Sequence, residues 1–369
     1  MIVAKLLALS LLIGLPLVGL LLVGHPVEPY LQFPPQTRYV QPAPFSWPLF
    51  VGLALLIAST LGPFTLRIAA SHLFRLEETK VVRPFPWWGW LAVALTGSSW
   101  FLAWNRFAWF ATLQSHTFTP LWVGYILTVN AWTLRRTGRC MMLDRPRFFL
   151  VLFPASAGFW WCFEYLNRFV QNWYYVGPDG LTPTGYFLHA TLPFSTVLPS
   201  VLGTMELLAS MPRLWAGSDR LPTFIWPGHR WMGWSLLIVA CVGLTAISIW
   251  PSRLFPLVWL APLLLITALQ IIAGNETIFS RISHGDWTAL WLAAVAALVC
   301  GLCWEMWNSR SLAHWEYAIP SVHRFKLFEM PLLGYAGYLP FGLECLAVTM
   351  FLFPRQYREM IRTVVPTAQ

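Results

Sequence analysis

Charged side chains are scarce in this chain. Only 11% of its 369 residues are Asp, Glu, Lys or Arg, whereas 57% are hydrophobic. A soluble domain has about 25% charged residues, because its surface faces water. The shortage therefore excludes an ordinary soluble protein and indicates that lipid surrounds most of the surface.

Several functional motifs are also missing. The sequence has no P-loop, no G-x-G-x-x-G, no H-E-x-x-H and no paired Asp motif of the prenyltransferase kind. The net charge of +9 forms no basic block, which excludes nucleic acid as a partner. Cys300 and Cys303 have redox spacing, but no second Cys pair lies in a predicted loop, so we interpret them as packing residues. No metal site is predicted, and no cofactor is identified.

Long apolar runs are abundant instead. Ten of them have about the 17–25 residues that a membrane-spanning helix needs. We interpret the first as a retained helix, because no small-x-small cleavage pattern follows it. The predicted fold class is all-α, a polytopic transmembrane bundle of about ten helices. The runs lie at 3–24, 47–66, 87–104, 118–134, 148–166, 187–210, 231–250, 255–273, 286–304 and 331–353.

The basic residues orient these runs. With the N-terminus in the cytoplasm, 17 of the 24 Lys and Arg residues fall on the cytoplasmic side, as the positive-inside rule requires. We therefore expect a multi-pass protein of the cell inner (cytoplasmic) membrane with both termini in the cytoplasm. The segment 26–48, rich in Pro and aromatic residues, is expected to form an extracytoplasmic cap.

An internal repeat is predicted from a motif of the form C-aromatic-E-x-x-N. It occurs at 162–167 and again at 303–308, with an offset of 141 residues. We predict two leading helices in 1–70, parallel four-helix repeats in 87–210 and 231–353, and a cytoplasmic tail in 354–369. Further pairs follow in the same order: Trp88-Gly89-Trp90 with Met232-Gly233-Trp234, Trp173 with Trp315, Leu198-Pro199 with Leu339-Pro340, and Glu206 with Glu344.

The repeated motif also predicts a site. Glu164 and Asn167 share one helix face, as do Glu305 and Asn308, and a carboxyl group in an apolar environment is expensive and usually functional. We predict that Glu164 and Glu305 are catalytic acids or bases at one aromatic-lined site near the extracytoplasmic surface. Alternatively, these groups only bond across helices and fix the packing. The predicted substrate-binding residues are Asn167, Arg168, Asn308, Arg310, His314, Glu316, Trp161 and Trp304.

Other ionisable residues suggest different chemistry. Glu206 and Glu344 are predicted to lie deeper in the membrane, where they would couple to protons. Arg168 is one turn from Glu164 and could pair with it. His25, His116 and His189 map near the extracytoplasmic side and could hold a haem. The repeat does not duplicate these histidines, which argues against a matched haem pair.

The predicted function is the binding or modification of an isoprenoid or other lipid-phase substrate at the aromatic Glu/Asn site. The sequence does not decide between an enzyme and a binding protein. Two alternatives stay open, a proton-coupled secondary transporter and a quinone-binding membrane subunit of an electron-transfer complex. The expected partners are membrane lipid and a lipid-phase or small-molecule ligand.

Overall fold

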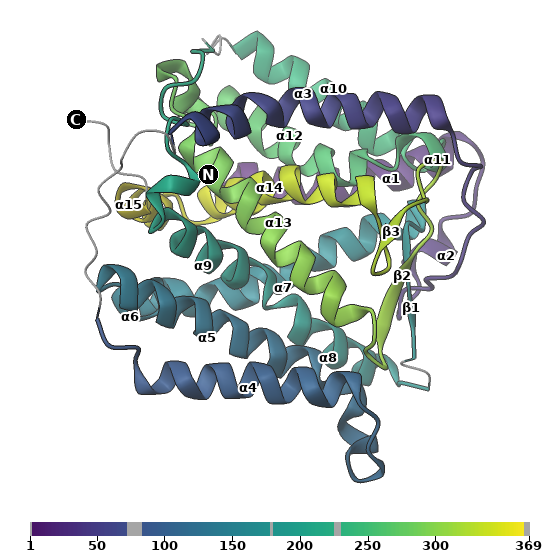
Figure 1. The fold of residues 1–369 in the computed structure, drawn as a ribbon. Coiled ribbons are helices and arrows are strands. Elements are labelled where there is room, and N and C mark those ends of the chain that lie inside the picture. The colour runs from purple at the N-terminus through teal and green to yellow at the C-terminus, as the bar shows by residue number, and fades with distance from the viewer. Residues whose placement is uncertain (1, 72–82, 178–179, 225–229, 365–369) are drawn as a thin grey trace.

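A computed structural model describes residues 2–71, 83–177, 180–224 and 230–364. Helices dominate, and they run side by side between two ends of the molecule (Figure 1). The helices are α1 (Ile2–Leu22), α2 (Glu28–Leu31), α3 (Trp47–Ser71), α4 (Trp87–Trp104), α5 (Phe118–Thr137), α6 (Met141–Asp144), α7 (Pro146–Val170), α8 (Pro183–Phe194), α9 (Val197–Ala209), α10 (Arg230–Ala246), α11 (Pro251–Leu254), α12 (Leu257–Ile272), α13 (Thr288–Asn308), α14 (Tyr338–Leu352) and α15 (Pro354–Val364). The 3-10 helices are η1 (Ala108–His116), η2 (Pro212–Leu214), η3 (Ser280–His284) and η4 (Leu332–Gly337).

The apolar runs predicted from the sequence are helical. Within the described ranges, six helical stretches are long and apolar enough to cross a membrane, which indicates a multi-pass membrane protein. They are Ile2–Leu22, Trp47–Ala70, Pro146–Val170, Pro183–Ala209, Thr288–Asn308 and Leu332–Leu352. The helices Arg230–Ala246 and Leu257–Ile272 are apolar but shorter. The larger number of about ten spans stays a prediction.

One predicted run is interrupted. The run 187–210 forms two helices, α8 and α9, which meet at Ser195 and Thr196. Pro199 lies in the first turn of α9 and has no N–H to donate to the Ser195 carbonyl, so an unbroken α-helix is disfavoured there. Ser156 of α7 supports the break, because its hydroxyl donates to the Phe194 carbonyl at 2.6 Å and accepts from the Leu198 amide at 3.0 Å.

The two halves of the bundle pack in a similar order. In the first half α4 packs on α5, and α9 contacts both α5 and α7. In the second half α10 packs on α12, and α14 contacts both α12 and α13. The main contact between the halves joins α9 to α13 near the centre of the molecule (Figure 1).

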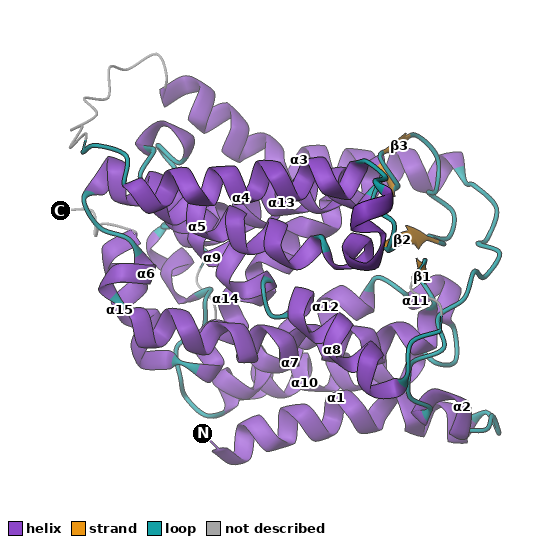
Figure 2. Ribbon diagram, turned by 90° about the horizontal axis from the view of Figure 1, so that it is seen from below, coloured by secondary structure: helices purple, strands orange, loops and turns teal. Residues whose placement is uncertain are grey.

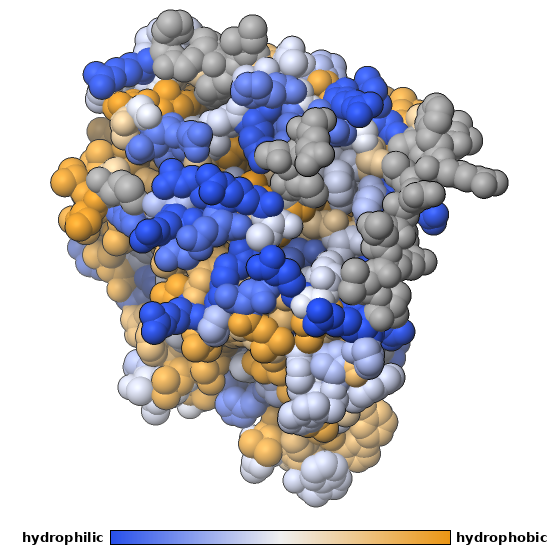
Figure 3. Space-filling view, turned by 90° about the vertical axis from the view of Figure 1, so that its left-hand side faces the viewer, coloured by the Kyte–Doolittle hydropathy of each residue, from blue (hydrophilic) through white to orange (hydrophobic). Residues whose placement is uncertain are grey.

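The two ends of the molecule differ. The start of α1 and the amphipathic helix α15 lie at one end, where Lys5 donates to the Leu352 carbonyl at 3.0 Å. Hydrophilic residues gather on this end face, with apolar residues around and below them (Figure 3). The helix α2 and the strands lie at the opposite end (Figure 2).

The all-α prediction missed short strands. The described residues include β1 (Trp173–Val176), β2 (His314–Tyr317), β3 (Lys326–Leu327) and β4 (Met330–Pro331). The strands β1 and β2 pair in antiparallel fashion although about 140 residues separate them in sequence. Such non-local pairing leaves little local signal, which explains why no strand is predicted between the runs 148–166 and 187–210 or between 286–304 and 331–353.

Candidate functional site

The β1–β2 pair lies over the ends of α7 and α13. Trp173 pairs with Tyr317, Tyr174 with Glu316, and Tyr175 with Trp315. Because successive side chains of a strand point to opposite faces, the Trp and Tyr residues at 173, 175, 315 and 317 share one face, which turns toward the helices.

Both Asn residues of the repeated motif bind a strand backbone. The Asn167 side chain donates to the Trp173 carbonyl at 2.8 Å and accepts from the Asn172 amide at 2.8 Å. The Asn308 side chain donates to the Trp315 carbonyl at 2.7 Å and accepts from the Trp315 amide at 2.8 Å. Both side chains are fully buried. They position the strands, and these bonds occupy the groups that were expected to bind a substrate.

Glu164 accepts three hydrogen bonds on one carboxyl oxygen. The Tyr175 hydroxyl donates to its Oε1 at 2.6 Å, and the indole N–H groups of Trp160 and Trp173 donate at 3.1 Å each. The carboxyl group is fully buried. Its Oε2 has no hydrogen-bond partner in the described protein.

Glu305 has the corresponding arrangement with different donors. The hydroxyls of Tyr317 and Tyr338 donate to its Oε1 at 2.6 Å and 2.7 Å. The Trp315 indole donates to the Tyr317 hydroxyl at 2.8 Å. Oε2 of Glu305 is also buried, and no described residue bonds to it.

The phenols that bind these carboxyl groups remain protonated at neutral pH. Burial raises the pKa of Tyr175 and of Tyr317 well above the usual value for tyrosine. Both hydroxyls are therefore donors, and each carboxyl group accepts its bonds on Oε1 alone.

Aromatic side chains connect the two carboxyl sites. Trp304 packs against Trp122 with ring centres 4.9 Å apart, and Phe163 stacks on Trp259 at 5.0 Å. Phe341 lies between them, 5.7 Å from Phe163 and 6.2 Å from Trp304. Aromatic side chains therefore lie between the two carboxyl groups, and Trp304 is one of them.

Trp161 and Arg168 point elsewhere. The Trp161 indole donates to the Thr191 hydroxyl at 3.0 Å, and its ring stacks on Phe187. Arg168 donates to the carbonyls of Tyr30 and Gln32 at 2.6 Å and 2.8 Å. Among the described contacts it forms no ion pair with Glu164, because its guanidinium holds the segment after α1 instead.

The other predicted polar residues lie outside the carboxyl sites. Glu316 accepts from the Tyr174 hydroxyl on the outer face of the strands, and His314 lies 3.5 Å from its second oxygen. Arg310 packs over the Trp104 ring at 5.1 Å. The structure thus separates these three residues from Glu305, although the sequence places them close together.

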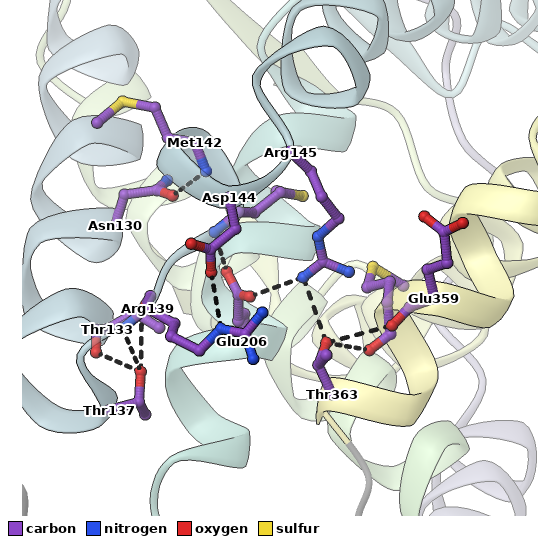
Figure 4. Close-up of polar contacts among 12 residues, drawn as sticks. Asn130, Thr133, Thr137, Arg139, Met142, Asp144, Arg145, Glu206, Glu359 and Thr363 are labelled. Atoms are coloured by element: carbon purple, nitrogen blue, oxygen red, sulfur yellow. Dashed lines mark hydrogen bonds and ion pairs between the residues drawn. The ribbon is translucent and has the colours of Figure 1, made fainter.

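Glu206 lies between the turn around α6 and the helix α15 (Figure 4). Arg145 donates to its Oε1 at 3.1 Å, and the Met141 amide donates to its Oε2 at 2.8 Å. Arg145 also donates to Thr363 of α15 at 3.3 Å. Glu206 therefore holds the turn around α6 through a largely buried ion pair.

Glu344 has a different environment. It lies in α14 with no exposed surface, and neither carboxyl oxygen has a hydrogen-bond partner among the described residues. Matching Pro199 with Pro340 in the uninterrupted helices α9 and α14 matches Glu344 with Gly203 rather than with Glu206. The two glutamates therefore differ both in register and in surroundings.

Two of the histidines considered for haem contact each other directly. The Nδ1 atoms of His116 and His189 are 3.2 Å apart, and the rings meet edge to face at 4.9 Å. This contact leaves no room for a haem plane between the two rings. Within the described ranges no group of three or more metal-ligating side chains occurs.

Sequence reasoning missed the donors to the carboxyl groups. Tyr175 and Tyr317 belong to a W-x-Y pattern that follows each E-x-x-N motif, and this second pattern was available as a signal. Tyr338 and Trp160 have no counterpart in the other half, so only the structure identifies them.

The site thus offers two buried carboxyl groups joined by aromatic side chains, and in each group one oxygen is bonded while the other has no partner among the described residues. Such groups are suited to proton transfer in an apolar medium. No known family model, curated protein or solved structure matches this chain.

Proposed function

We infer that residues 87–210 and 231–353 are two copies of one four-helix unit, related by a two-fold axis along the membrane normal. The antiparallel direction of β1 and β2 agrees with this, because a two-fold axis between equivalent strands reverses one strand relative to the other.

Packing between the units supports the same axis. Trp122 of α5 contacts Trp304 of α13, while Trp259 of α12 contacts Phe163 of α7. Phe163 and Trp304 occupy the same position of the repeated motif. Each unit therefore places one Trp against the motif helix of the other unit.

We propose that the end with α15 faces the cytoplasm and that the protein lies in the inner membrane. The excess of Lys and Arg in the loops assigned to this end supports the orientation. The amphipathic helix α15 agrees with it. Its apolar residues Tyr357, Met360 and Ile361 are buried, whereas Arg358 and Arg362 are exposed, as expected at a membrane interface.

We propose that the protein binds and modifies a lipid-phase substrate, such as an isoprenoid, with Glu305 as the catalytic acid. One observation carries this proposal: Oε1 of the buried Glu305 accepts two hydrogen bonds, while Oε2 has none in the described protein. In a neutral carboxyl group of this kind, Oε2 bears the proton and offers an O–H donor. The neighbouring aromatic faces suit an apolar or cationic intermediate.

The helix α3 offers a side from which a lipid-phase molecule could approach. None of its described residues is buried, and it contacts η4 near one end and η2 near the other. Phe50 and Leu53 of α3 pack against the same small cluster as Tyr317 and Tyr338. The phenols of the Glu305 site are therefore close to the least tightly packed helix of the bundle.

The test compares the wild type with Glu305→Gln, each expressed in cells whose membrane lipids are then extracted and analysed by mass spectrometry. Gln keeps the shape and still accepts the two phenol bonds, so the variant should remain folded. We expect a lipid-phase product with the wild type and loss of that product with the variant. The proposal is overturned if the wild-type extract matches that from cells with an empty vector.

Glu344 favours a second candidate, the proton-coupled transporter. A buried carboxyl group whose oxygens have no described partner is expensive unless it binds a proton. Thr267 and Gln270 of the neighbouring helix α12 also carry buried oxygens that are unbonded in the described part of the chain. Proton uptake into liposomes containing the wild type, and its loss in Glu344→Gln, would favour transport. Lipid conversion without proton uptake would exclude it.

A further inference from the structure

We propose that the two carboxyl sites have diverged. Glu305 transfers the proton, Tyr338 is the positioning residue that returns the proton to it, and Glu164 only holds its strand. This inference rests on the proposed function, because it names the group that acts on the lipid-phase substrate. Its chemical basis is the exchange of one hydrogen-bond donor between the halves.

The exchange involves two positions. With the offset of 141 residues, Trp160 corresponds to Gly301, and Val197 corresponds to Tyr338. In the first unit the extra donor is an indole from the same helix as Glu164. In the second unit it is a phenol from the neighbouring helix α14.

Gly301 makes this exchange possible. A Cβ atom at this position would overlap the ring carbons of Tyr338, because it would lie far closer to them than two carbon atoms can approach. The Tyr338 ring therefore lies directly on the backbone of α13, one turn before Glu305. Any larger side chain at 301 would displace the phenol from the carboxyl group.

Indoles and phenols differ in what they do with a proton. An indole N–H is a donor only, whereas a phenol oxygen both donates and accepts. Glu164 has two indole donors and a single phenol, and that phenol belongs to the strand that Glu164 holds. Glu305 has two phenols on one oxygen.

The proposed step is a proton transfer to an oxygen of the substrate. The O–H bond at Oε2 of Glu305 breaks, its electron pair stays on the carboxylate, and the proton forms an O–H bond on the substrate. The hydroxyls of Tyr317 and Tyr338 stabilise the carboxylate through Oε1. A hydronium ion then supplies the next proton: Tyr338 donates its own proton to Oε1 of Glu305, its oxygen accepts the new proton, and water remains. The carboxyl group rotates by half a turn, so that the new O–H group faces the substrate and the other oxygen accepts the phenol bonds. The ligand class is therefore an apolar lipid with an oxygen acceptor at its polar end.

The experiment uses the full-length protein in membranes and matched variants of both sites. Glu305→Gln and Tyr338→Phe should reduce lipid conversion by about 100-fold or more, the size of a typical general-acid contribution. Phe keeps the ring against Gly301, so the unfolding temperature of Tyr338→Phe should stay close to that of the wild type. Tyr338→Phe should lower kcat and leave KM nearly unchanged. Glu164→Gln should lower the unfolding temperature, and its loss of lipid conversion should be much smaller than that of Glu305→Gln.

An infrared measurement decides the same point without any substrate. The carboxyl band of Glu305 is identified as the band that is absent in Glu305→Gln. After transfer into D2O this band should shift within seconds, and Tyr338→Phe should slow the shift. The band that is absent in Glu164→Gln should shift much more slowly. The proposed divergence is overturned if the carboxyl bands of Glu164 and Glu305 exchange at equal rates, or if the two Gln variants lose lipid conversion equally. If the wild type converts no lipid, the proposed function fails, and the infrared comparison still decides the divergence.

Discussion

Glu164 and Glu305 lie 141 residues apart in the sequence, yet their surroundings in the structure are similar. Each carboxyl group is buried, each accepts on Oε1 from the Tyr of a W-x-Y strand, and each lies on a helix whose Asn binds that strand. Two donors differ. Trp160 binds Glu164, whereas Tyr338 binds Glu305. The Trp173 indole reaches Glu164 directly, whereas the equivalent Trp315 indole binds the Tyr317 hydroxyl. A similar arrangement thus keeps both strands in place, and the exchange of Trp160 for Tyr338 is the basis of the divergence that we propose.

A second contrast concerns the glutamates of α9 and α14. Glu206 is bonded to Arg145, whereas Glu344 has no bonded partner in the described structure. Arg145→Ala should therefore destabilise the protein by about 3–5 kcal/mol, because it leaves a largely buried carboxylate without its cation. Denaturant unfolding in detergent, followed by Trp fluorescence, measures this loss.

Glu344→Gln is the control for that comparison. It removes no bonded partner, so its free energy of unfolding should change by less than about 1 kcal/mol. Similar losses for the two variants would mean that Glu344 also has a charged partner, and the contrast between α9 and α14 would be lost.

Gly301→Ala tests the comparison of α7 with α13, the two helices that carry the repeated motif. The added methyl group meets the Tyr338 ring, and overpacking of this kind costs about 1–3 kcal/mol. Gly158→Ala on α7 is the matched control, since a Cβ there meets no atom within 4 Å. Ala is the better helix former, so the control should be neutral or stabilising. A neutral Gly301→Ala would contradict the position of Tyr338.

The two Asn residues should behave alike if the scaffold is shared. Asn167→Ala and Asn308→Ala each leave buried strand groups unbonded, which costs about 1–3 kcal/mol. Because β1 and β2 pair, the double variant should lose less than the sum of the two single losses. Unfolding free energies of the three variants test this. Strictly additive losses would mean that the two strands contribute to stability independently.

Trp161→Phe should have the smallest effect. It loses the bond from the indole to Thr191, worth about 0.5–1.5 kcal/mol, and keeps a ring against Phe187. Lipid conversion should not change, because Trp161 contacts neither carboxyl site. A loss of lipid conversion at unchanged stability would mean that Trp161 contributes to the substrate site.

Local patterns predicted much of this molecule. Apolar runs identified the helices, α4 to the residue, and the repeated motif pointed to its Glu and Asn, although their bonds to strands were not predicted. The sequence groups His314 and Glu316 with Glu305. Only the pairing of β2 with β1 places these two side chains on the opposite face of the strand. Tyr338 was equally hidden, since its approach to Gly301 depends on how α13 packs on α14.

The pairing of β1 with β2 is the central claim, because both carboxyl sites and the two-fold relation depend on it. Tyr174 and Glu316 face each other at its centre. Cys residues placed at both positions should form a disulfide in the membrane, since opposite residues of antiparallel strands have Cα atoms about 4.5–5.5 Å apart. Cys residues at 174 and 314 lie on a diagonal of about 7–8 Å and should remain reduced. Mass spectrometry of the protein digest should find the 174–316 disulfide alone, whereas equal yields for both pairs, or none for 174–316, would contradict the account.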